Sequence, residues 1–383
     1  MTSRLFVAVC ALIVAALCAL SLGGPVFYLV AWALFLMIVY AFLSALLASR
    51  LISVRQSAED SKLERGNNST LFLELHNRSL LPAAAPALQL SLPEGRAGVQ
   101  IDVAPLRRQS ASFPFYLPHV GVTRVGVEKA WASDPFRFFR LRIRRGMEPV
   151  EVCVLPRSFD VDKLSFLAQD DGRALPNRVS EDITSPEDTR NYRDGDALKR
   201  VHWKLSSRKR ELLVRRFEMP APPDTLILMD CSDPEGGERA EDGLNRLKDT
   251  LCETALSVAK MQMEGGQSVR VPLYGAHASE FKADRAGSLS LLKEELAYQI
   301  FRGGEPFPKV LNVELRRMRR TGATIVVTTR LDAEIVEGVK HIRRSGPSVR
   351  FYLVTFAPDE PAYQPFVQQL QHHLVEVCYV TPA

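Results

Sequence analysis

Two long, uncharged, apolar runs at the start of the chain constrain its fold more than any other feature of the sequence. The first extends from Leu5 to Leu22 and the second from Val26 to Ala48, with a Gly-Gly-Pro turn between them. A helix needs roughly 20 apolar residues to cross a bilayer, with about 17 as the lower limit, and glycine and proline interrupt helices. The sequence therefore predicts a hairpin of two transmembrane helices over residues 1–50.

The charges beside these runs predict the orientation of the hairpin. Arg4 also suits the start of a cleaved signal peptide, but a second full-length apolar run follows at once, which favours two retained spans. The turn between the runs is uncharged, whereas Arg4 precedes the first run and Arg50 and Arg55 follow the second. Positive flanks stay on the cytoplasmic side of a membrane. We therefore expect a two-pass protein of the cytoplasmic (inner) membrane, with residues 51–383 in the cytoplasm.

Cysteine usage agrees with a cytoplasmic soluble part. The chain has six cysteines, without a Cys-x-x-Cys pair or a Cys/His cluster at zinc spacing. Scattered cysteines of this kind are typical of free thiols in a reducing compartment, and a disulfide framework or a zinc site is not expected. The sequence predicts no cofactor.

Alternating apolar and polar residues from about Leu71 to Pro156 predict short β-strands, and no helical stretch interrupts them. Turn residues separate the strands, as at 93–95, where the sequence is Pro-Glu-Gly. Strands at this spacing predict a β-sandwich domain over residues 51–157. At 139–144 three arginines alternate with apolar residues. These arginines form the solvated face of a half-buried strand or, as the alternative, bind an anionic surface.

The pattern changes from Thr225 onward, where short apolar runs alternate with helical spacing. The runs TLILMD and ATIVVTT are typical of buried parallel strands. Helical spacing occurs over residues 238–264, 289–300, 333–344 and 362–371. Strands that alternate with helices predict a doubly wound, Rossmann-like α/β sheet over residues 223–383, with residues 158–222 as a connector. The sequence has neither a GxGxxG nor a P-loop motif, so nucleotide binding is not predicted.

Asp230 and Ser232 stand after the first of these strands, where open α/β sheets bind ligands. The sequence at 230–234 resembles the D-x-S-x-S motif of the von Willebrand factor A domain, whose Asp and Ser side chains hold a divalent cation. Here Pro234 replaces the second Ser, and Arg330 follows the second buried strand where a carboxylate is expected. A hard cation needs several oxygen ligands. We therefore expect a degenerate site that binds no metal, with Asp230 bonded to loop amides; a divalent-cation-dependent hydrolase is kept as an alternative function.

Positive charge is concentrated at residues 190–218. This segment has ten Lys or Arg against four Asp or Glu, and the surplus of six exceeds the net charge of +5 of the whole chain. Asp196 is predicted to cap a short helix that begins at Ala197, and Trp203 is expected to bury its indole between the soluble domains. The basic residues then form a docking surface or, as the alternative, the solvated face of a connector.

The same segment offers two catalytic interpretations. His202 with Asp194 or Asp196 has the residue types of a base and its orienting acid. The two acidic residues, together with Glu211 and Lys204, resemble part of a metal-dependent nuclease. The spacing is not diagnostic of either, and no GxSxG nucleophile motif occurs. We therefore expect no catalytic residues.

The sequence NYRDGDALKRVHWKLSSRKRELLVRRFE at 191–218 resembles the signature of the bacterial family known as domain of unknown function 58. That signature is, loosely, Y-x-x-G-D-x-x-x-x-I-x-W-K-x-S-A-R-x-x-x-L-x-V-x-x-x-E. Its matches here are Tyr192, Gly195, Asp196, Trp203, Lys204, Ser206, Arg208, Leu212, Val214 and Glu218. Val201 and Ser207 stand where Ile and Ala are usual. The sequence SDPFRFFR at 133–140 also resembles the family's D-P-F-G-L-F-R, with Arg137 at the Gly position.

The resemblance implies a von Willebrand factor A-like domain and genomic company with MoxR-type AAA+ ATPases and transglutaminase-like membrane proteins, without an assigned reaction. We therefore expect a membrane-anchored, non-catalytic scaffold or adaptor that works with a MoxR-type ATPase in complex assembly or maturation. Lys199 and Arg200 belong to its expected docking surface, with the signature residues. The alternative is a protein that binds nucleic acid or anionic lipid through its basic surface, and of these two nucleic acid is not the expected partner.

Overall fold

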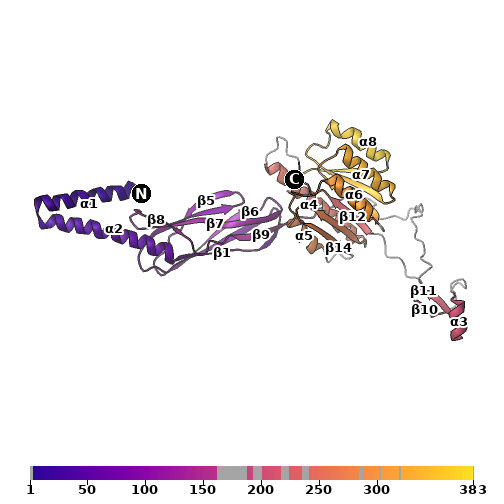
Figure 1. Cartoon of the computed structure of the whole chain (residues 1–383), viewed down its shortest axis with the longest axis horizontal. Helices are drawn as coiled ribbons and strands as arrows, with labels where there is room; N and C mark the ends of the chain where they lie inside the picture. Colours follow the sequence, from indigo (N-terminus) through magenta and orange to yellow (C-terminus); the bar gives the residue numbers. More distant parts are fainter. Residues whose placement is uncertain are drawn as a thin grey trace. The chain divides into compact units, whose positions relative to one another are not determined.

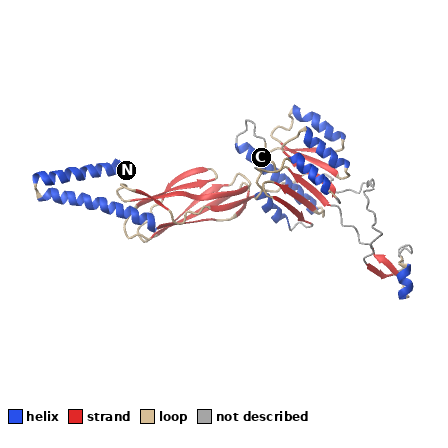
Figure 2. Ribbon diagram, in the orientation of Figure 1, coloured by secondary structure: helices blue, strands red, loops and turns tan. Residues whose placement is uncertain are grey.

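Helices and strands combine in a mixed α/β architecture in the computed structural model, as the sequence predicts (Figures 1 and 2). The structure describes residues 3–161, 188–192, 201–216, 224–234, 241–283, 288–301, 303–318 and 321–382. The chain divides into two compact units, one of residues 1–157 with 293–298 and the other of residues 158–292 with 299–383.

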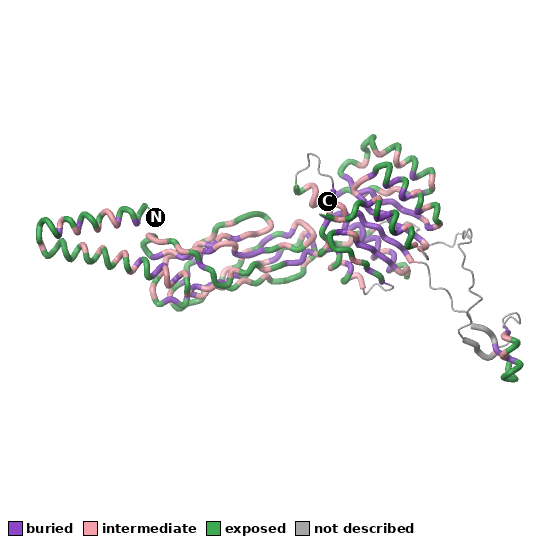
Figure 3. Tube along the Cα trace, in the orientation of Figure 1, coloured by how far each residue is buried: buried purple, intermediate pink, exposed green. Residues whose placement is uncertain are grey.

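Two apolar helices, α1 (Ser3–Leu22) and α2 (Pro25–Leu51), are each long and apolar enough to cross a membrane. Gly23 takes a left-handed φ of 61° between them, a conformation that glycine adopts without strain. Pro25 opens α2, where the N–H that proline lacks would have no helical partner. Most side chains along both helices are exposed (Figure 3). The expected pair of apolar helices is confirmed, while its orientation in a membrane stays a prediction.

Two sheets follow the helices in the first unit. The first is antiparallel, with strands β1 (Ile52–Ala58), β3 (Asn68–Asn77) and β6 (Arg108–Tyr116). The second has the order β2-β9-β7-β4-β5, with β8 paired to β7. Its strands are β2 (Lys62–Glu64), β4 (Ala84–Leu92), β5 (Gly95–Gln100), β7 (Gly121–Ser133), β8 (Arg140–Ile143) and β9 (Val150–Leu155).

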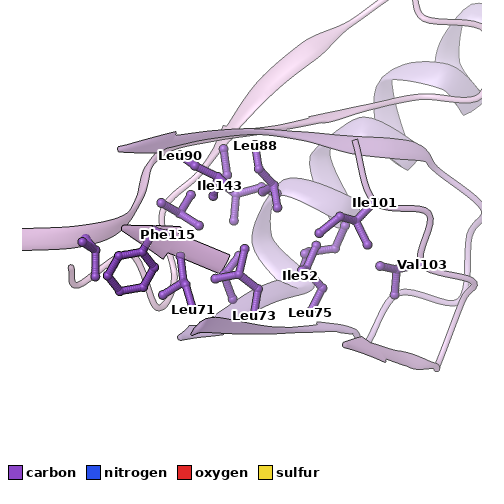
Figure 4. Close-up of a cluster of buried hydrophobic side chains, with 14 of the residues drawn as sticks. Ile52, Leu71, Leu73, Leu75, Leu88, Leu90, Ile101, Val103, Phe115 and Ile143 are labelled. Carbon is purple, nitrogen blue, oxygen red and sulfur yellow. The ribbon is translucent and has the colours of Figure 1, made fainter. Parts of the chain in front are cut away.

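A continuous apolar core lies between these two sheets (Figure 4). Leu71, Leu73 and Leu75 alternate along β3 and are completely buried, because every second side chain of a strand points to the same face. Leu88 and Leu90 of β4 join the same core from the second sheet. The sheets therefore pack face to face, the arrangement that the alternating sequence predicts.

The second unit contains a six-stranded sheet in the order β14-β13-β12-β15-β16-β17. The strands are β12 (Asp224–Met229), β13 (Val269–Tyr274), β14 (Ala278–Ala283), β15 (Thr321–Thr328), β16 (Ser348–Val354) and β17 (Glu376–Val380). All neighbours are parallel except the edge pair β13 and β14. From β12 the chain moves to β13 on one side and returns to β15 on the other. The strand order thus reverses between β12 and β15, where open α/β sheets hold ligands.

Helices cover both faces of this sheet (Figure 2). They are α4 (Glu241–Glu264), α6 (Phe307–Arg317), α7 (Ala333–Arg344) and α8 (Gln364–His372), the last preceded by the short η3 (Pro361–Tyr363). Helix α5 (Leu289–Ala297) is divided between the two units, with its residues from 293 onward in the first. Leu226 and Leu228 of β12 share a core with α6, α7 and α8. Ile227, which lies between them, faces the opposite side of the strand. The sequence pattern indicates α4, α5, α7 and α8 to within a few residues and misses α6 and β14.

Candidate functional site

The carboxyl ends of β12 and β15 bring together two segments that are far apart in the sequence. Asp230 directly follows β12, and Thr328 ends β15 two residues before Arg330. Because the two strands are adjacent and parallel, their carboxyl ends meet at the same edge of the sheet. Ser232, in the loop after β12, completes this group. We call these four residues the switch-point cluster.

Both carboxylate oxygens of Asp230 accept hydrogen bonds within the cluster. The Thr328 hydroxyl donates to Oδ2 at 2.8 Å, and a guanidinium nitrogen of Arg330 lies 3.4 Å from the same oxygen. Oδ1 accepts from the backbone amide of Ser232 at 3.0 Å and also from its hydroxyl. Arg330 donates to the Ser232 hydroxyl oxygen as well. Asp230 is only 1% exposed, so these contacts replace the water that a carboxylate otherwise binds.

The positively charged guanidinium of Arg330 therefore lies beside the side-chain oxygens of Asp230 and Ser232. A hard divalent cation would need these oxygens and several more, and its charge would be repelled by the guanidinium of Arg330. Among the residues that the structure describes, no group of three or more His, Cys, Asp or Glu side chains could hold a metal ion. The residues present do not fit a divalent cation. The bond from the Ser232 amide is the loop-amide contact that the sequence predicts for Asp230.

The rim of the sheet beside this cluster is tightly packed. A Cβ atom at Gly304 would approach the carbonyl oxygen of Cys231 to 2.4 Å, so a side chain there would force the backbone apart. Burial, with a contribution from the neighbouring Asp230 charge, raises the pKa of Cys231 to about 12. Its thiol is therefore protonated at neutral pH and is a poor nucleophile.

A buried carboxylate, Glu314 of α6, joins the helix to β13. The Tyr274 hydroxyl donates to Glu314 Oε1 at 2.6 Å, and Arg317 donates to the same oxygen at 2.7 Å. Arg270 contacts the second oxygen at 2.8 Å. Burial and the bond to Glu314 raise the pKa of Tyr274. Because Glu314 is completely buried among these partners, the network holds α6 against the sheet and offers no exposed carboxylate to a ligand.

The segment that resembles the family signature forms a small β-hairpin, and the chain between its two strands contains a short helix. Strands β10 (Asp188–Asn191) and β11 (Leu213–Arg216) pair in antiparallel fashion. The amide of Tyr192 extends the pairing by donating to the Leu212 carbonyl at 2.8 Å. Helix α3 (Trp203–Lys209) lies between the two strands in the sequence. We call β10, α3 and β11 the signature hairpin.

Two polar side chains fix α3 to the strand that follows it. The amide of Leu213 donates to the Ser206 hydroxyl oxygen at 2.9 Å, and Ser206 is 6% exposed. His202 caps the helix, because its Nδ1 accepts from the Leu205 amide at 3.2 Å. The backbone amide of His202 also donates to the Leu213 carbonyl at 2.8 Å. These bonds give Ser206 and His202 a role in local structure.

Trp203 is not covered by the signature hairpin itself, while the expectation that it is buried between the soluble domains stays a prediction. Its exposed fraction is 60%. The side of this seven-residue helix that faces β11 carries Ser206, whose hydroxyl oxygen accepts from the Leu213 amide. Lys204, Arg208 and Lys209 are exposed on the same helix. A solvent-exposed Trp among cations has the composition of an interface hot spot.

Helix α3 also begins later than expected. The sequence predicts a start at Ala197 with Asp196 as the cap, but Val201 forms a β-bridge and His202 caps a helix that begins at Trp203. Val201 is the buried residue at this junction, with 4% exposure. The remaining signature and docking residues lie outside the described residues, namely Gly195, Asp196, Lys199, Arg200 and Glu218.

Comparison with known proteins finds one family model that matches this region. A family model described as "Protein of unknown function DUF58" matches residues 188–346, which contain the signature hairpin and the switch-point cluster. The family expected from the signature is confirmed over that range. The chain is also 22% identical over 223 residues to the "Uncharacterized protein YeaD" of Bacillus subtilis. That match covers 54% of this chain and 55% of the relative, so the chain spans about half of the relative's length.

Likeness to solved structures is slight. The CARDB domain of the PF1109 protein from Pyrococcus furiosus matches 27% of this chain and 91% of its own, with 8% identity and a TM-score of 0.22. Cwp6 from Clostridium difficile matches 86% of this chain and 37% of its own, with 10% identity and a TM-score of 0.16. Scores of this size do not bear on the fold or the function.

Proposed function

We propose, from the DUF58 match over residues 188–346, that this protein is a membrane-anchored, non-catalytic scaffold that docks a partner through its signature hairpin. The family resemblance favours a MoxR-type AAA+ ATPase as the partner, in the assembly or maturation of a complex. A transglutaminase-like membrane protein is a second candidate member of the same assembly.

The exposure of Trp203 is the observation that carries this proposal. Trp and Arg are the residues most often found at the energetic centre of interfaces, and Trp203 is 60% exposed on a helix whose Arg208 is exposed as well. The bonds of Ser206 and His202 hold that helix on β11, so the surface is organised before a partner arrives. Preorganisation lowers the entropic cost of binding. An acidic partner surface complements its cations.

The switch-point cluster supports a role without catalysis. Asp230 is bonded to Thr328, Ser232 and Arg330, and the Cys231 thiol is protonated. A divalent-cation-dependent hydrolase would need metal ligands, and the described ranges contain no suitable acidic or His/Cys group. The hydrolase alternative is therefore not the function we propose.

The sheet itself we propose to be von Willebrand factor A-like. Asp230 and Ser232 keep the first two positions of the D-x-S-x-S motif at the end of β12, beside the point where the strand order reverses. In this proposal the guanidinium of Arg330 takes the position that the cation has in the metal-binding domains.

The proposed location is the bacterial inner membrane, with two passes and the soluble units in the cytoplasm. Arg4, Arg50 and Arg55 flank the two apolar helices, and the turn between them is uncharged. A reporter fused after Ala383 should be active in its cytoplasmic form only. Activity of a periplasmic reporter at that position would overturn the topology.

Site-specific photo-crosslinking in the full-length, membrane-inserted protein tests the docking proposal. A photoreactive amino acid at Trp203 should crosslink to the MoxR-type ATPase, whereas the same group at Phe72, which is 45% exposed on β3, should not. Crosslinks from position 203 to nucleic acid or lipid would favour the basic-surface alternative. Equal crosslinking from both positions would remove α3 from the docking surface.

A further inference from the structure

The turn over residues 134–140 has a fixed shape that is set by a buried carboxylate. Asp134 is completely buried, and its side chain accepts from the amide of Phe136 at 2.9 Å and from that of Phe139 at 2.7 Å. Its carbonyl accepts from the amide of Arg137 at 2.9 Å. Arg137 adopts a left-handed φ of 60° at the tip. The turn therefore presents aromatic side chains and an arginine in a defined arrangement.

Aromatic contacts join this turn to α2. The rings of Phe139 and Phe42 meet edge to face with 5.4 Å between centroids, and those of Phe136 and Tyr40 meet at 6.5 Å. Phe136 also stacks on Phe138 at 5.5 Å. Despite these contacts Phe136 stays 40% exposed. The turn is thus fixed at one level along α2, with part of its aromatic surface uncovered.

A second loop contacts α2 at nearly the same level. The hydroxyl of Ser44 donates to the Pro82 carbonyl at 2.6 Å. The side chain of Asn77 holds the start of this loop, because it accepts from the Ser79 amide at 2.9 Å. Between these anchors Leu80 is 77% exposed. Leu80 therefore adds exposed apolar surface to a loop that is anchored on α2.

The position of these contacts along α2 matches the edge of a bilayer. A helix rises about 1.5 Å per residue, so residues 40–44 lie about 23–29 Å from Pro25. The hydrocarbon core of a bilayer is about 30 Å thick, and aromatic residues gather at its boundary with water. If α2 crosses the membrane from Pro25, the turn and the loop contact it just inside the boundary between the hydrocarbon core and the lipid head groups.

Exposed cations lie on the same turn and on the strand that follows it. Arg137 is exposed at the tip, and Arg140 and Arg142 are exposed on β8. The guanidinium of Arg140 lies over the ring of Trp131, 4.3 Å from its centroid. No salt bridge to Arg137 or Arg142 occurs within the part of the chain that the structure describes. A guanidinium binds phosphate oxygens in pairs, which suits these positions to a phosphate-bearing surface.

We propose that the turn over residues 134–140 and the loop over residues 78–82 together form a membrane-docking surface for the head groups of anionic phospholipids. Phe136 and Leu80 enter the interface, while Arg137 and Arg142 bind lipid phosphates. Charge complementarity and continuity with the apolar helix α2 select lipid as the occupant. The inference rests on the proposed membrane span of α2 and is independent of the partner of the signature hairpin.

Hydrogen exchange of the full-length protein in nanodiscs tests this inference. Discs of phosphatidylcholine are compared with discs that also contain phosphatidylglycerol. Amides of residues 134–140 and 78–82 should exchange at least about tenfold more slowly in the anionic discs, because each arginine near an anionic surface contributes roughly fivefold. Exchange in the core of β3 should be equal in both discs, which controls for global stability.

A double variant and a matched control separate lipid binding from packing. Arg137→Gln with Arg142→Gln should lose most of the difference between the two discs. Arg96→Gln with Arg124→Gln removes the same charge near the opposite end of β7, where these residues pair with Glu128 and Glu151, and should keep the difference.

Equal exchange of these loops in both lipids would overturn the inference, and so would an unchanged difference in the Arg137 and Arg142 variant. Failure of the wild-type chain to enter nanodiscs would overturn the proposed span, and the lipid surface with it. If the double variant is unfolded, as faster exchange in β3 would reveal, wild-type protein at high salt supplies the same comparison, because screening should abolish the lipid-dependent difference.

Discussion

The switch-point cluster and the signature hairpin both combine acidic or polar groups with arginine, but solvent reaches them very differently. Asp230 is 1% exposed and has its charge opposed by Arg330, whereas Trp203 is 60% exposed on a helix with exposed cations. The cluster occupies the position where α/β sheets bind ligands, yet its groups bond to one another. The signature hairpin does not lie at a position where ligands usually bind, yet its Trp and cationic side chains are exposed to water. In the proposed scaffold, the docking surface is expected where side chains are exposed to water, and the usual ligand position of the sheet is not expected to bind.

Removal of the carboxylate from the switch-point cluster should have the largest effect on stability. It would test whether the residues of the cluster stabilise the protein by bonding to one another. Asp230→Ala removes an acidic partner of the Arg330 guanidinium and the acceptor of the bonds from Thr328 and Ser232, so the free energy of unfolding should fall by about 2–4 kcal/mol. The loss is below that of a fully buried pair because the Arg330 side chain is 25% exposed. Denaturant unfolding of the full-length protein in detergent measures it. Asp230→Asn, which keeps an acceptor for Thr328, should lose less; equal stability of Asp230→Ala and wild type would contradict an internal ion pair.

Truncation of the exposed Trp203 indole tests the signature hairpin, the second region of the comparison. Trp203→Ala should change the free energy of unfolding by no more than about 0.5 kcal/mol, because the side chain is mostly in water. Affinity for the MoxR-type ATPase should fall at least tenfold, about 1.4 kcal/mol or more. Thermal unfolding and a binding titration measure the two quantities, with Phe72→Ala as the control for loss of an exposed ring. A large loss of stability would mean that Trp203 is covered in the intact protein, and unchanged affinity would exclude it from the interface.

Charge reversal on α3 should have a smaller effect, on the rate of association. Lys204→Glu with Arg208→Glu should leave the fold intact, because each exposed charge contributes about 0–1 kcal/mol. The association rate with an acidic partner should fall several-fold at low salt and lose most of its salt dependence. Stopped-flow association at two ionic strengths measures this, and the same reversal at Arg96 and Arg124 is the control. If variant and wild type have the same association rate and salt dependence, these cations are only solvated and do not take part in docking.

The smallest expected effect comes from opening the switch-point cluster to a cation. Arg330→Ala exposes the oxygens of Asp230, Ser232 and Thr328, too few for a strong site. About 10 mM Mg²⁺ should raise the free energy of unfolding of the variant by at most about 1 kcal/mol and leave wild type unchanged. Thermal unfolding with and without a chelator measures the difference. A magnesium-dependent stabilisation of wild type would contradict the comparison, because it would mean that the switch-point cluster binds an external ligand.

Periodic sequence patterns predict most of the fold, and local exceptions explain the omissions. The uncharged runs of α1 and α2, the alternation of Leu71, Leu73 and Leu75, and the buried β12 and β15 are all evident in the sequence. Helix α6 is missed because its apolar stripe, Phe307, Val310 and Leu311, continues with Glu314. That carboxylate is bound by Arg317 on the same helix and by Tyr274 and Arg270 of β13, and the two partners from β13 cannot be inferred from spacing.

The candidate sites were predictable to different extents for the same reason. The D-x-S sequence indicates Asp230 and Ser232, but their contact with Thr328 and Arg330 depends on the pairing of β12 with β15. The exposure of Trp203 was not predictable, because Trp is highly buried on average in proteins and only the structure reveals that Ser206 lies on the side of α3 that faces β11.

The guanidinium beside Asp230 has a consequence for how this edge of the sheet responds to its surroundings. A metal ion dissociates, competes with other ions and is removed by chelators, whereas a cation that belongs to the polypeptide cannot dissociate from it. The local charge at the ends of β12 and β15 is therefore constant, whatever the concentration of divalent ions in the cell. Changes in ion concentration are therefore not expected to act on this edge as a signal, and in the proposed scaffold the control of docking is expected to come from the partner or from the membrane.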